Sequence, residues 1–436
     1  MKTYIFVALP SSGHINAMLK IAWELKGKGN RILFATLNKT EIISRLEREG
    51  FQVLIVPMSY TAVGYLLLPL TKGYVETYFA ASLFFSSMKH YTNKTIRLID
   101  EHKPDCIISD FAFPGAYIAA EIKEIPFAIL YHAGLAYAGP GIPPFASGLP
   151  IGKEWGYKGK LLKYFYDRME KRFQYKMNRV RSYFSLASKK SSLSSGLYSP
   201  WLTLVLTSEI SEAPRYNLPA STFFVGPCVE IEKNAEFDVS RLKKEKIIYV
   251  SLGTFFNNKP GVLKKIINAL SPESWDVVIS CGKSYKKLNK IKFSENIHIY
   301  ESVPQMQILS IADAVITHGG NNTINETLWS GKPMLVMPVG GEQMDNAEKI
   351  VYLQTGLRAD IAKASPDEIY SKVSQLINNI TFKRNAEIIS RELSKTNGIL
   401  TSVKMLEYLA EEKKPVVRPG NYPLTVQFGQ TFPWEA

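Results

Sequence analysis

Apolar runs and helical patterns alternate along the chain in a repeated order. Residues 4–9 form an uninterrupted apolar run, which is typical of a buried strand, and residues 16–28 carry apolar positions at helical spacing. Much later, an apolar run at 247–252 is followed by a helical pattern over 262–270. In both places a glycine-bearing turn joins the strand to the helix. The pattern therefore predicts that a strand–turn–helix unit opens two separate parts of the chain.

A second pair of segments repeats one spacing. Asp105 begins a buried strand and Asp110 follows five positions later, just past the end of that strand. Asp313 and His318 stand in the same relation. In both segments a helix comes next, and a proline then opens another strand. This arrangement predicts an α/β fold with two Rossmann-like, doubly wound domains, whose ligands bind at the carboxyl ends of the strands. We expect Asp110 and His318 at those ends.

Changes of composition suggest where the two domains end. The run 229–246 is rich in charge and lacks a sustained apolar pattern, so it is interpreted as a linker. The first domain is then expected at 1–228 and the second at 247–412. Residues 413–436 contain four prolines and several aromatic residues. They are expected to form an extended tail that lies over a surface.

Composition and cysteine usage exclude several classes of protein. Of the 436 residues, 46% are apolar and 21% are charged, as in a folded soluble protein. No apolar run reaches the ~18 residues of a membrane span, and the apolar run at the N-terminus is too short for a secretory signal. Three scattered cysteines, and histidines without ligand spacing, predict neither a disulfide framework nor a metal site. We therefore expect a cytoplasmic protein without a bound metal.

The positive charge is concentrated in one segment. The formal net charge is +14, and nine Lys or Arg face two acidic residues between Lys158 and Arg181. Apolar residues recur there at steps of three or four: Leu162, Phe165, Met169, Phe173, Met177, Val180 and Phe184. The favoured interpretation is a surface helix whose apolar face packs on its own domain. The alternative is peripheral contact of 158–184 with an anionic membrane, at its cytoplasmic face. No nucleic-acid-binding pattern occurs, so a nucleic acid partner is not expected.

The segment 317–326 carries the strongest chemical signal. A strand ends at Ile316, two glycines follow, and a helix begins near Asn321. The free N–H groups and positive dipole end of such a helix attract an anion. His318 and Thr323 add donors suited to a diphosphate, and Glu326 is placed to accept hydrogen bonds from ribose hydroxyls. The alternative is an ordinary helix cap with a solvated carboxylate.

The chain resembles the cytosolic UDP-glycosyltransferases, which glucosylate small lipophilic acceptors and include plant flavonoid, bacterial macrolide and carotenoid enzymes. The resemblance covers most of the chain. It rests on six motifs in the family's order: Gly13-His14, Val225-Gly-Pro227, Ser251-Leu-Gly-Thr254, Val303-Pro-Gln305, His318-Gly-Gly-x-Asn-Thr-x-x-Glu326, and Glu342-Gln343-x-x-Asn346-Ala347. Two positions depart from the family pattern. Ser302 stands where members often have Trp, and Ala17 stands where Pro is common.

The resemblance implies a GT-B fold, with two domains facing across a cleft and the nucleotide held by the C-terminal one. It also implies a role for each matching position. Val303 and Gln305 would contact the base, Glu326 the ribose, and Glu342 with Gln343 the sugar hydroxyls. The phosphates would be held by a set of small, polar and imidazole residues: Ser251, Gly253, Thr254, His318, Gly320, Asn322 and Thr323.

His14 is the candidate general base, because imidazole, with an ordinary pKa of ~6.5, takes a hydroxyl proton at neutral pH. Asp110 is expected to hold the other ring nitrogen and to stabilise the imidazolium. The alternatives are a solvent-exposed loop histidine and, for Asp110, a helix cap. No Asp-x-Asp motif is present to hold a divalent cation on the diphosphate, so the expected reaction is metal-independent.

These expectations combine into a hypothesis of function. The chain would be an inverting glycosyltransferase that moves a hexose, with UDP-glucose as the favoured co-substrate, to a hydroxyl of a small lipophilic acceptor such as a carotenoid, polyketide or sterol-like molecule. No other cofactor is expected. Three alternatives stay open: a transferase for a dTDP-deoxysugar, a non-catalytic accessory protein that binds a sugar nucleotide, and an enzyme that epimerises UDP-sugars.

Overall fold

The computed structural model divides the chain into two compact units. It describes residues 1–60, 79, 82–135, 141–189, 197–215, 217–230, 237–253, 260–272 and 275–435, the side chain of residue 158 excepted. The first unit contains Met1–Ser147, Gly152–Cys228 and Lys395–Ala436, and the second contains Gly148–Ile151 and Val229–Ser394.

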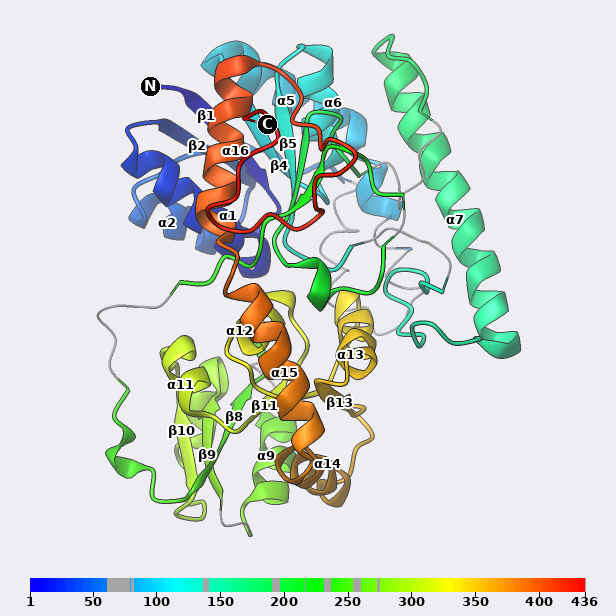
Figure 1. Ribbon diagram of the computed structural model, residues 1–436. Coiled ribbons are helices and arrows are strands. Elements are labelled where there is room, and N and C mark those ends of the chain that lie inside the picture. Colours follow the sequence, from blue (N-terminus) through cyan, green and yellow to red (C-terminus); the bar gives the residue numbers. More distant parts are fainter. Residues whose placement is uncertain are drawn as a thin grey trace. The chain divides into compact units, whose positions relative to one another are not determined.

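The first unit is built on a seven-stranded parallel sheet in the order β3-β2-β1-β4-β5-β6-β7. The strands are β1 (Thr3–Ala8), β2 (Arg31–Leu37), β3 (Gln52–Val56), β4 (Cys106–Asp110), β5 (Phe127–Tyr131), β6 (Leu202–Val205) and β7 (Thr222–Phe224). The helices around them are α1 (Ser12–Gly27), α2 (Thr40–Arg48), α5 (Met88–His102), α6 (Pro114–Ile122), α7 (Gly156–Tyr183) and α16 (Gly398–Glu412), shown in Figure 1.

The second unit is a six-stranded parallel sheet in the order β10-β9-β8-β11-β12-β13. Its strands are β8 (Lys246–Ser251), β9 (Trp275–Ser280), β10 (Ile297–Tyr300), β11 (Ala314–Thr317), β12 (Met334–Val336) and β13 (Gly356–Arg358). Its α-helices are α9 (Pro260–Leu270), α10 (Tyr285–Leu288), α11 (Gln305–Ile311), α12 (Asn321–Trp329), α13 (Glu342–Tyr352), α14 (Pro366–Asn378) and α15 (Ile380–Leu393).

Alternation along the strands supplies a core on each face of both sheets. In β1, Ile5 and Val7 belong to one apolar cluster, whereas Tyr4 and Phe6 belong to the cluster on the other face. A strand that is buried on both sides has to be apolar throughout, which explains the uninterrupted runs in the sequence. Both sheets have the doubly wound strand order, so the predicted fold class is confirmed.

The repeated aspartates, Asp105 and Asp313, accept equivalent backbone hydrogen bonds in the two units. Asp105 accepts the backbone N–H of Thr3 at 2.8 Å, at the start of β1. Asp313 accepts the backbone N–H of Ile247 at 2.9 Å, beside the start of β8. Each aspartate thereby ties the beginning of one central strand to the beginning of its neighbour. The residues five positions further on consequently lie at the carboxyl ends of the two sheets.

The C-terminal segment does not follow the expected boundary at residue 412. Residues 395–436 belong to the first unit, since α16 packs on α1 through Leu406 and Leu409 in the cluster beneath it. The run 413–436 is extended over that unit. Its backbone pairs with Trp201 through Val416 and with Phe224 through Leu424 and Val426. The run 229–246, expected to be a linker, is grouped with the second unit.

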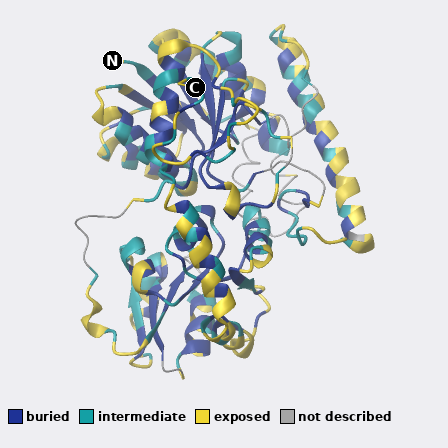
Figure 2. Ribbon diagram, in the orientation of Figure 1, coloured by how far each residue is buried: buried dark blue, intermediate teal, exposed yellow. Residues whose placement is uncertain are grey.

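Helix α7 packs through its apolar stripe, as the favoured interpretation expected. Phe173 and Met177 are buried in the first unit's core, and the other stripe residues pack against it, except Phe165, which is 46% exposed. The outer face of the helix is exposed along much of its length (Figure 2). Among the residues that the structure describes, no helix combines the length and apolar character needed to cross a bilayer.

Candidate functional site

His14 and Asp110 meet at the carboxyl edge of the first sheet. β1 and β4 are neighbours at the point where the strand order reverses, and this is where doubly wound sheets bind ligands. Asp110 is the last residue of β4, and His14 lies in the first turn of α1, which begins at Ser12, earlier than the sequence pattern indicated. His14 Nδ1 hydrogen-bonds to Asp110 Oδ2. Two residues 96 positions apart are thus paired as the sequence analysis expected.

The surroundings of Asp110 favour its ionised form. The side chain is fully buried, and Oδ1 accepts the N–H of Ala112 at 2.9 Å while Oδ2 faces the N–H of Leu9 at 3.4 Å. Burial opposes ionisation, but the two adjacent histidines outweigh it and hold the pKa of Asp110 well below its usual range. Asp110 therefore binds His14, as expected, and through Ala112 it also closes the turn that follows β4. The alternative role of a helix cap does not hold, because Phe113 occupies the N-cap position of α6.

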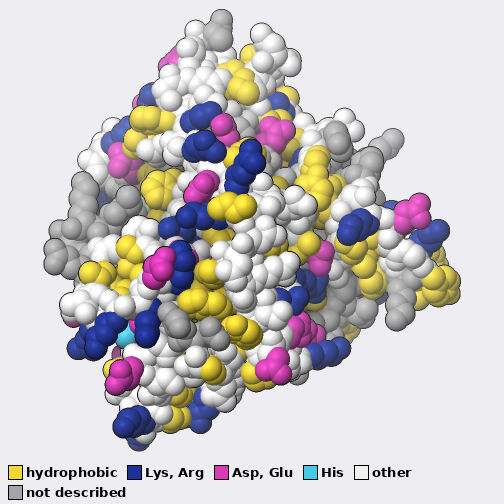
Figure 3. Space-filling view, turned by 60° about the horizontal axis from the view of Figure 1, so that its bottom comes forward, with side chains coloured by type: hydrophobic (Ala, Val, Ile, Leu, Met, Phe, Trp, Pro, Cys, Tyr) yellow, Lys and Arg dark blue, Asp and Glu magenta, His cyan; other side chains and the backbone are white. Residues whose placement is uncertain are grey.

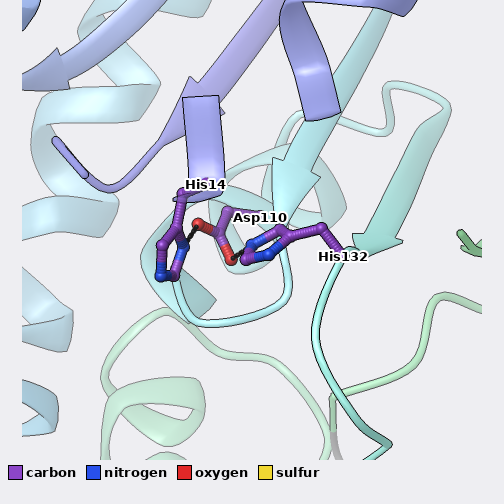
Figure 4. Close-up of side chains that lie close together, drawn as sticks. All are labelled: His14, Asp110 and His132. Atoms are coloured by element: carbon purple, nitrogen blue, oxygen red, sulfur yellow. Dashed lines mark hydrogen bonds and ion pairs between the residues drawn. The ribbon is translucent and has the colours of Figure 1, made fainter. Parts of the chain in front are cut away.

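A second histidine, His132, completes this cluster, and the sequence analysis missed it. His132 Nε2 lies 3.4 Å from Asp110 Oδ1, and its ring is 4.2 Å from that of His14, centroid to centroid (Figure 4). Among the described residues, His14, Asp110 and His132 are a group with metal-ligand chemistry, their ligand atoms all within 4.8 Å of one another. Because His132 directly follows the buried run 127–131, its place at a strand end was a signal available in the sequence.

In the second unit, His318 is enclosed by two glycines. It follows β11 directly and is 9% exposed. A Cβ at Gly253, after β8, would lie 2.3 Å from its Cε1, and one at Gly320 would lie 2.7 Å from its Nε2. Gly253 also has a φ of +68°, which favours glycine. The ring thus occupies space that only glycine leaves open, beside the start of α12.

His318 is a neutral imidazole at physiological pH. Burial lowers its pKa to about 4, and a hydrogen bond with the backbone of Ser251 opposes that shift only in part. It is therefore suited to donate a hydrogen bond to an anion, not to serve as a fixed positive charge. The positive potential at this place comes from the start of α12.

Gln305 and Glu326, expected to contact base and ribose, are hydrogen-bonded to each other. Gln305 Nε2 donates to Glu326 Oε2, and the hydroxyl of Tyr249 donates to Gln305 Oε1 at 3.0 Å. Glu326 projects from the middle of α12, and Gln305 begins α11. Val303, half-buried, lies just before α11. The structure thus joins two of the expected nucleotide-binding positions, Gln305 and Glu326, by a hydrogen bond.

The start of α13 is tied to the loop that carries His318. Asn346 Nδ2 donates to the backbone oxygen of Gly319 at 2.9 Å. Glu342 and Gln343 are the first two residues of this helix, and Gln343 Oε1 accepts the N–H of Val339 at 3.0 Å. The second unit therefore gathers the loops after β8, β11 and β12 at one edge of its sheet.

Three further expected positions complete the account. Asn322 and Thr323 lie in the first turn of α12, where the N–H groups of the helix are not used by its own backbone ladder. Thr254 lies outside the described residues. Asp276 and His298 form a separate pair, with His298 Nε2 2.8 Å from Asp276 Oδ1, away from these loops on β9 and β10.

Solved structures of known proteins share this architecture. In solved structures, the kitacinnamycin glycotransferase is similar over 93% of this chain and 98% of its own, with a TM-score of 0.72 at 20% identity. The spinosyn rhamnosyltransferase SpnG, complexed with thymidine diphosphate, is similar over 93% and 100%, with a TM-score of 0.66 at 18% identity. The chain accordingly has the GT-B fold of two parallel-sheet α/β domains.

Two proteins that are similar in sequence are also named as glycosyltransferases. The uncharacterized UDP-glucosyltransferase YojK of Bacillus subtilis (strain 168) is 27% identical over 221 residues, which are 50% of this chain and 54% of that protein. The match thus spans about half of that relative's length. Zeaxanthin glucosyltransferase of Pantoea ananas is 23% identical over an alignment of 450 residues, covering 97% of this chain and 99% of the relative.

The family assignment rests on a longer stretch of sequence. Residues 159–396 match the family model described as UDP-glucoronosyl and UDP-glucosyl transferase, which is more than half of the 436 residues. The match includes the loops after β8, β11 and β12 and the starts of α12 and α13. The chain therefore belongs to the family of UDP-glucoronosyl and UDP-glucosyl transferases.

Proposed function

We propose that this protein is an inverting glycosyltransferase that moves a hexose from a nucleotide sugar to a hydroxyl group of a small lipophilic acceptor. Glucose from UDP-glucose is the favoured donor, and a carotenoid, polyketide or sterol-like molecule is the favoured class of acceptor. The hydrogen bond between His14 and the buried Asp110 carries the proposal, because it prepares an imidazole as a base.

The first unit supplies that base. With Asp110 accepting from Nδ1, the proton of neutral His14 stays on Nδ1, and Nε2 is directed away from the carboxylate with its lone pair. Nε2 takes the proton of the acceptor hydroxyl while the oxygen attacks the anomeric carbon. The bond from that carbon to the diphosphate oxygen breaks, and its electron pair leaves with the nucleotide. The imidazolium that forms is stabilised by the Asp110 carboxylate. One displacement inverts the anomeric configuration.

The second unit holds the donor. The start of α12, with His318, Asn322 and Thr323, offers N–H and side-chain donors to the diphosphate and stabilises the charge that it gains on leaving. Ser251 and Gly253 add the turn after β8. In this proposal no divalent cation takes part, because the helix start and the neutral His318 do that work.

The remaining donor contacts follow the same edge of the sheet. We assign the base to Val303 and Gln305 and the ribose to Glu326. The hydrogen bond from Gln305 to Glu326 would fix both side chains before the nucleotide arrives. Glu342 and Gln343, at the start of α13, are assigned to the hexose hydroxyls, since a carboxylate beside an amide offers acceptors and donors together. Thr254 completes the phosphate set in this proposal.

The choice of donor and acceptor rests on relatives and on one sequence position. The zeaxanthin glucosyltransferase supports a glucosyl donor and a lipophilic acceptor. A dTDP-deoxysugar is the second candidate, supported by the thymidine diphosphate in the related spinosyn structure. Ser302 bears on this choice because it offers no ring on which a base could stack.

One experiment tests the proposal. The purified protein is incubated with UDP-glucose, or with a dTDP-sugar, and a panel of hydroxylated lipophilic acceptors. Nucleoside diphosphate release and the mass of each product are then measured. We expect acceptor-dependent UDP release and a product heavier by one hexose. Donor binding without release under any condition would favour an accessory protein, and a new sugar nucleotide formed without acceptor would favour epimerisation.

We also infer a peripheral membrane contact through α7, because its exposed face combines cations with aromatic rings. Lys160, Lys163, Arg168, Lys171, Arg172 and Arg179 are exposed there, beside exposed Tyr157, Tyr164, Phe165 and Tyr175. This mixture is suited to an anionic lipid surface. Figure 3 shows one face of the molecule, on which Lys and Arg side chains are interspersed with acidic and apolar ones.

Binding to liposomes tests this contact. Sedimentation with anionic vesicles is expected for the wild type and is expected to fall in the double variant Lys171→Glu, Arg172→Glu. The matched control is Lys286→Glu, Lys287→Glu, which reverses two exposed charges on α10. Equal loss in both double variants, or binding that survives reversal on α7, would count against the inference.

A further inference from the structure

The cluster around Asp110 has the composition of a metal site as well as that of a catalytic pair. His14, Asp110 and His132 come from the first turn of α1, the end of β4 and the residue after β5. Two imidazole nitrogens and one carboxylate oxygen are the ligand set that zinc takes in many proteins, with further positions left to water or substrate. We propose that these three residues form a binding site for a divalent transition-metal ion of the zinc type.

The distances allow such a site with a small movement of one ring. Ligands at ~2.1 Å from a tetrahedral ion lie roughly 3.4 Å from one another. His132 Nε2 and Asp110 Oδ1 already have that separation, at 3.4 Å. The ligand atoms of all three residues lie within 4.8 Å of one another. His14 Nδ1 is closer to Asp110 than two ligands of one ion would be, so its ring has to withdraw.

The surroundings leave His14 accessible and hold the rest of the site. His14 lies in the first turn of a helix, and its side chain is 24% exposed, which leaves a route for an ion from solvent. Asp110 is fixed by the N–H of Ala112, and the ring of His132 packs on that of Phe111 at 5.4 Å between centroids. Hydrogen bonds to a ligating carboxylate from outside the metal shell are typical of metal sites.

An ion at this place would switch off the reaction proposed above, and this part of the inference rests on that function. When Nδ1 of His14 binds the ion, the ring proton moves to Nε2, since a neutral imidazole carries one proton. Nε2 then has no lone pair with which to accept the proton of a hydroxyl group. This inhibitory ion is distinct from any cation on the diphosphate, because its ligands belong to the first unit.

Zinc binding to the whole protein tests the site without reference to activity. Apo-protein is titrated with Zn²⁺ in competition with a chromophoric chelator, and the stoichiometry and dissociation constant are measured. We expect one zinc ion per chain, with an affinity at least about ten-fold weaker in His132→Gln. His298→Gln is the matched control, because it removes a histidine that is also paired with an aspartate and should leave the affinity unchanged. His14→Gln provides a second test if His132→Gln does not fold.

The outcomes separate this inference from the proposed function. Wild-type protein that binds no zinc, or that binds it equally well in His132→Gln and His14→Gln, overturns the site. Equal weakening in His298→Gln overturns it too, because the ion then binds elsewhere. If zinc binds as expected and glycosyl transfer is found, Zn²⁺ should inhibit the wild type reversibly, with EDTA restoring activity. Zinc binding without any transfer activity would leave the site standing and refute only the proposed function.

Discussion

Asp110 shows how one buried residue organises the first unit's site. A carboxylate that has lost its water needs other donors, and this one receives backbone N–H groups from two loops and a histidine on each oxygen. The same contacts fix the ring of His14. These contacts therefore keep Asp110 ionised and orient the imidazole of His14. A change to the carboxylate should affect catalysis more than folding.

Replacement of Asp110 by Asn tests this coupling. The amide keeps the shape, but it bears no charge to stabilise an imidazolium and can present N–H to Nδ1, which would select the wrong tautomer of His14. We expect kcat to fall by roughly 10³- to 10⁴-fold. Binding of the nucleotide, measured by calorimetry, should change little. A kcat within ten-fold of wild type would contradict the assignment.

The lowered pKa of His318 predicts that the stability of the second unit depends on pH. Its folded pKa is about 4, whereas an unfolded histidine has ~6.5, so the unfolded chain binds the proton more readily between these values. The free energy of unfolding should therefore fall as the pH drops from about 6.5 to 4, by up to roughly 3 kcal/mol. Urea unfolding at pH 7.5 and 4.5 measures this loss. It should be smaller in His318→Gln, and an unchanged loss in that variant would refute the prediction.

At the scale of elements, the space beside the start of α12 depends on two neighbouring residues that have no side chain. The helix begins at Asn321, and the residues around it leave room for one buried ring because Gly253 and Gly320 have no side chains. A helix start can bind an anion only if the anion can approach its N–H groups closely. The two glycines thus leave an anion room to approach the helix start, and they also leave room for the ring of His318.

Gly320→Ala tests this role. The added methyl carbon would lie 2.7 Å from His318 Nε2, so the ring must shift out of its place beside the helix start. We expect the affinity for the nucleotide to fall at least about ten-fold, measured by calorimetry. Gly261→Ala in α9 is the control, because its added carbon meets nothing within 4 Å and alanine favours a helix. Equal affinities in the two variants would contradict the account.

The sequence predicted the parts of the site that local pattern controls. Apolar runs, glycines and the repeated aspartates predict strand ends next to Asp110 and His318 and a helix start near 321. In the structure Asp110 is itself the last residue of β4, and His318 directly follows β11. His132 was missed because a single histidine after a strand has no partner at readable spacing. Its relation to Asp110 depends on β4 and β5 being neighbours in the sheet. The link between Gln305 and Glu326 is likewise tertiary, since the two residues are 21 positions apart and lie on different helices.

At the scale of the whole molecule, the chain returns to its first unit at the end. Residues 395–436 complete the core beneath α1, although the preceding 166 residues, 229–394, belong to the second unit. The sequence pattern could not reveal this, because an amphipathic helix shows which face is buried and not which sheet covers it. The first unit is therefore assembled from both ends of the chain.

Removal of residues 413–436 tests the contribution of this return. Val416, Val426 and Phe432 are buried in the cluster with α1 and α16, and burial of each contributes about 1.5–3 kcal/mol. The shortened chain should therefore unfold at a clearly lower temperature, followed by calorimetry. Nucleotide binding at a temperature where the chain is still folded should persist, because the residues that we propose for it lie in the second unit. An unchanged melting temperature would show that the tail contributes nothing.

The central claim is that His14 removes the proton of the acceptor hydroxyl, and its replacement tests this most directly. With an acceptor selected from the panel, the rate of UDP release and the dissociation constant of the nucleotide are measured for wild type, His14→Ala and the control His102→Ala at the end of α5. The account predicts that His14→Ala lowers turnover by roughly 10²- to 10⁴-fold and leaves nucleotide affinity nearly unchanged, with His102→Ala like wild type. Turnover of His14→Ala close to that of the wild type would contradict it.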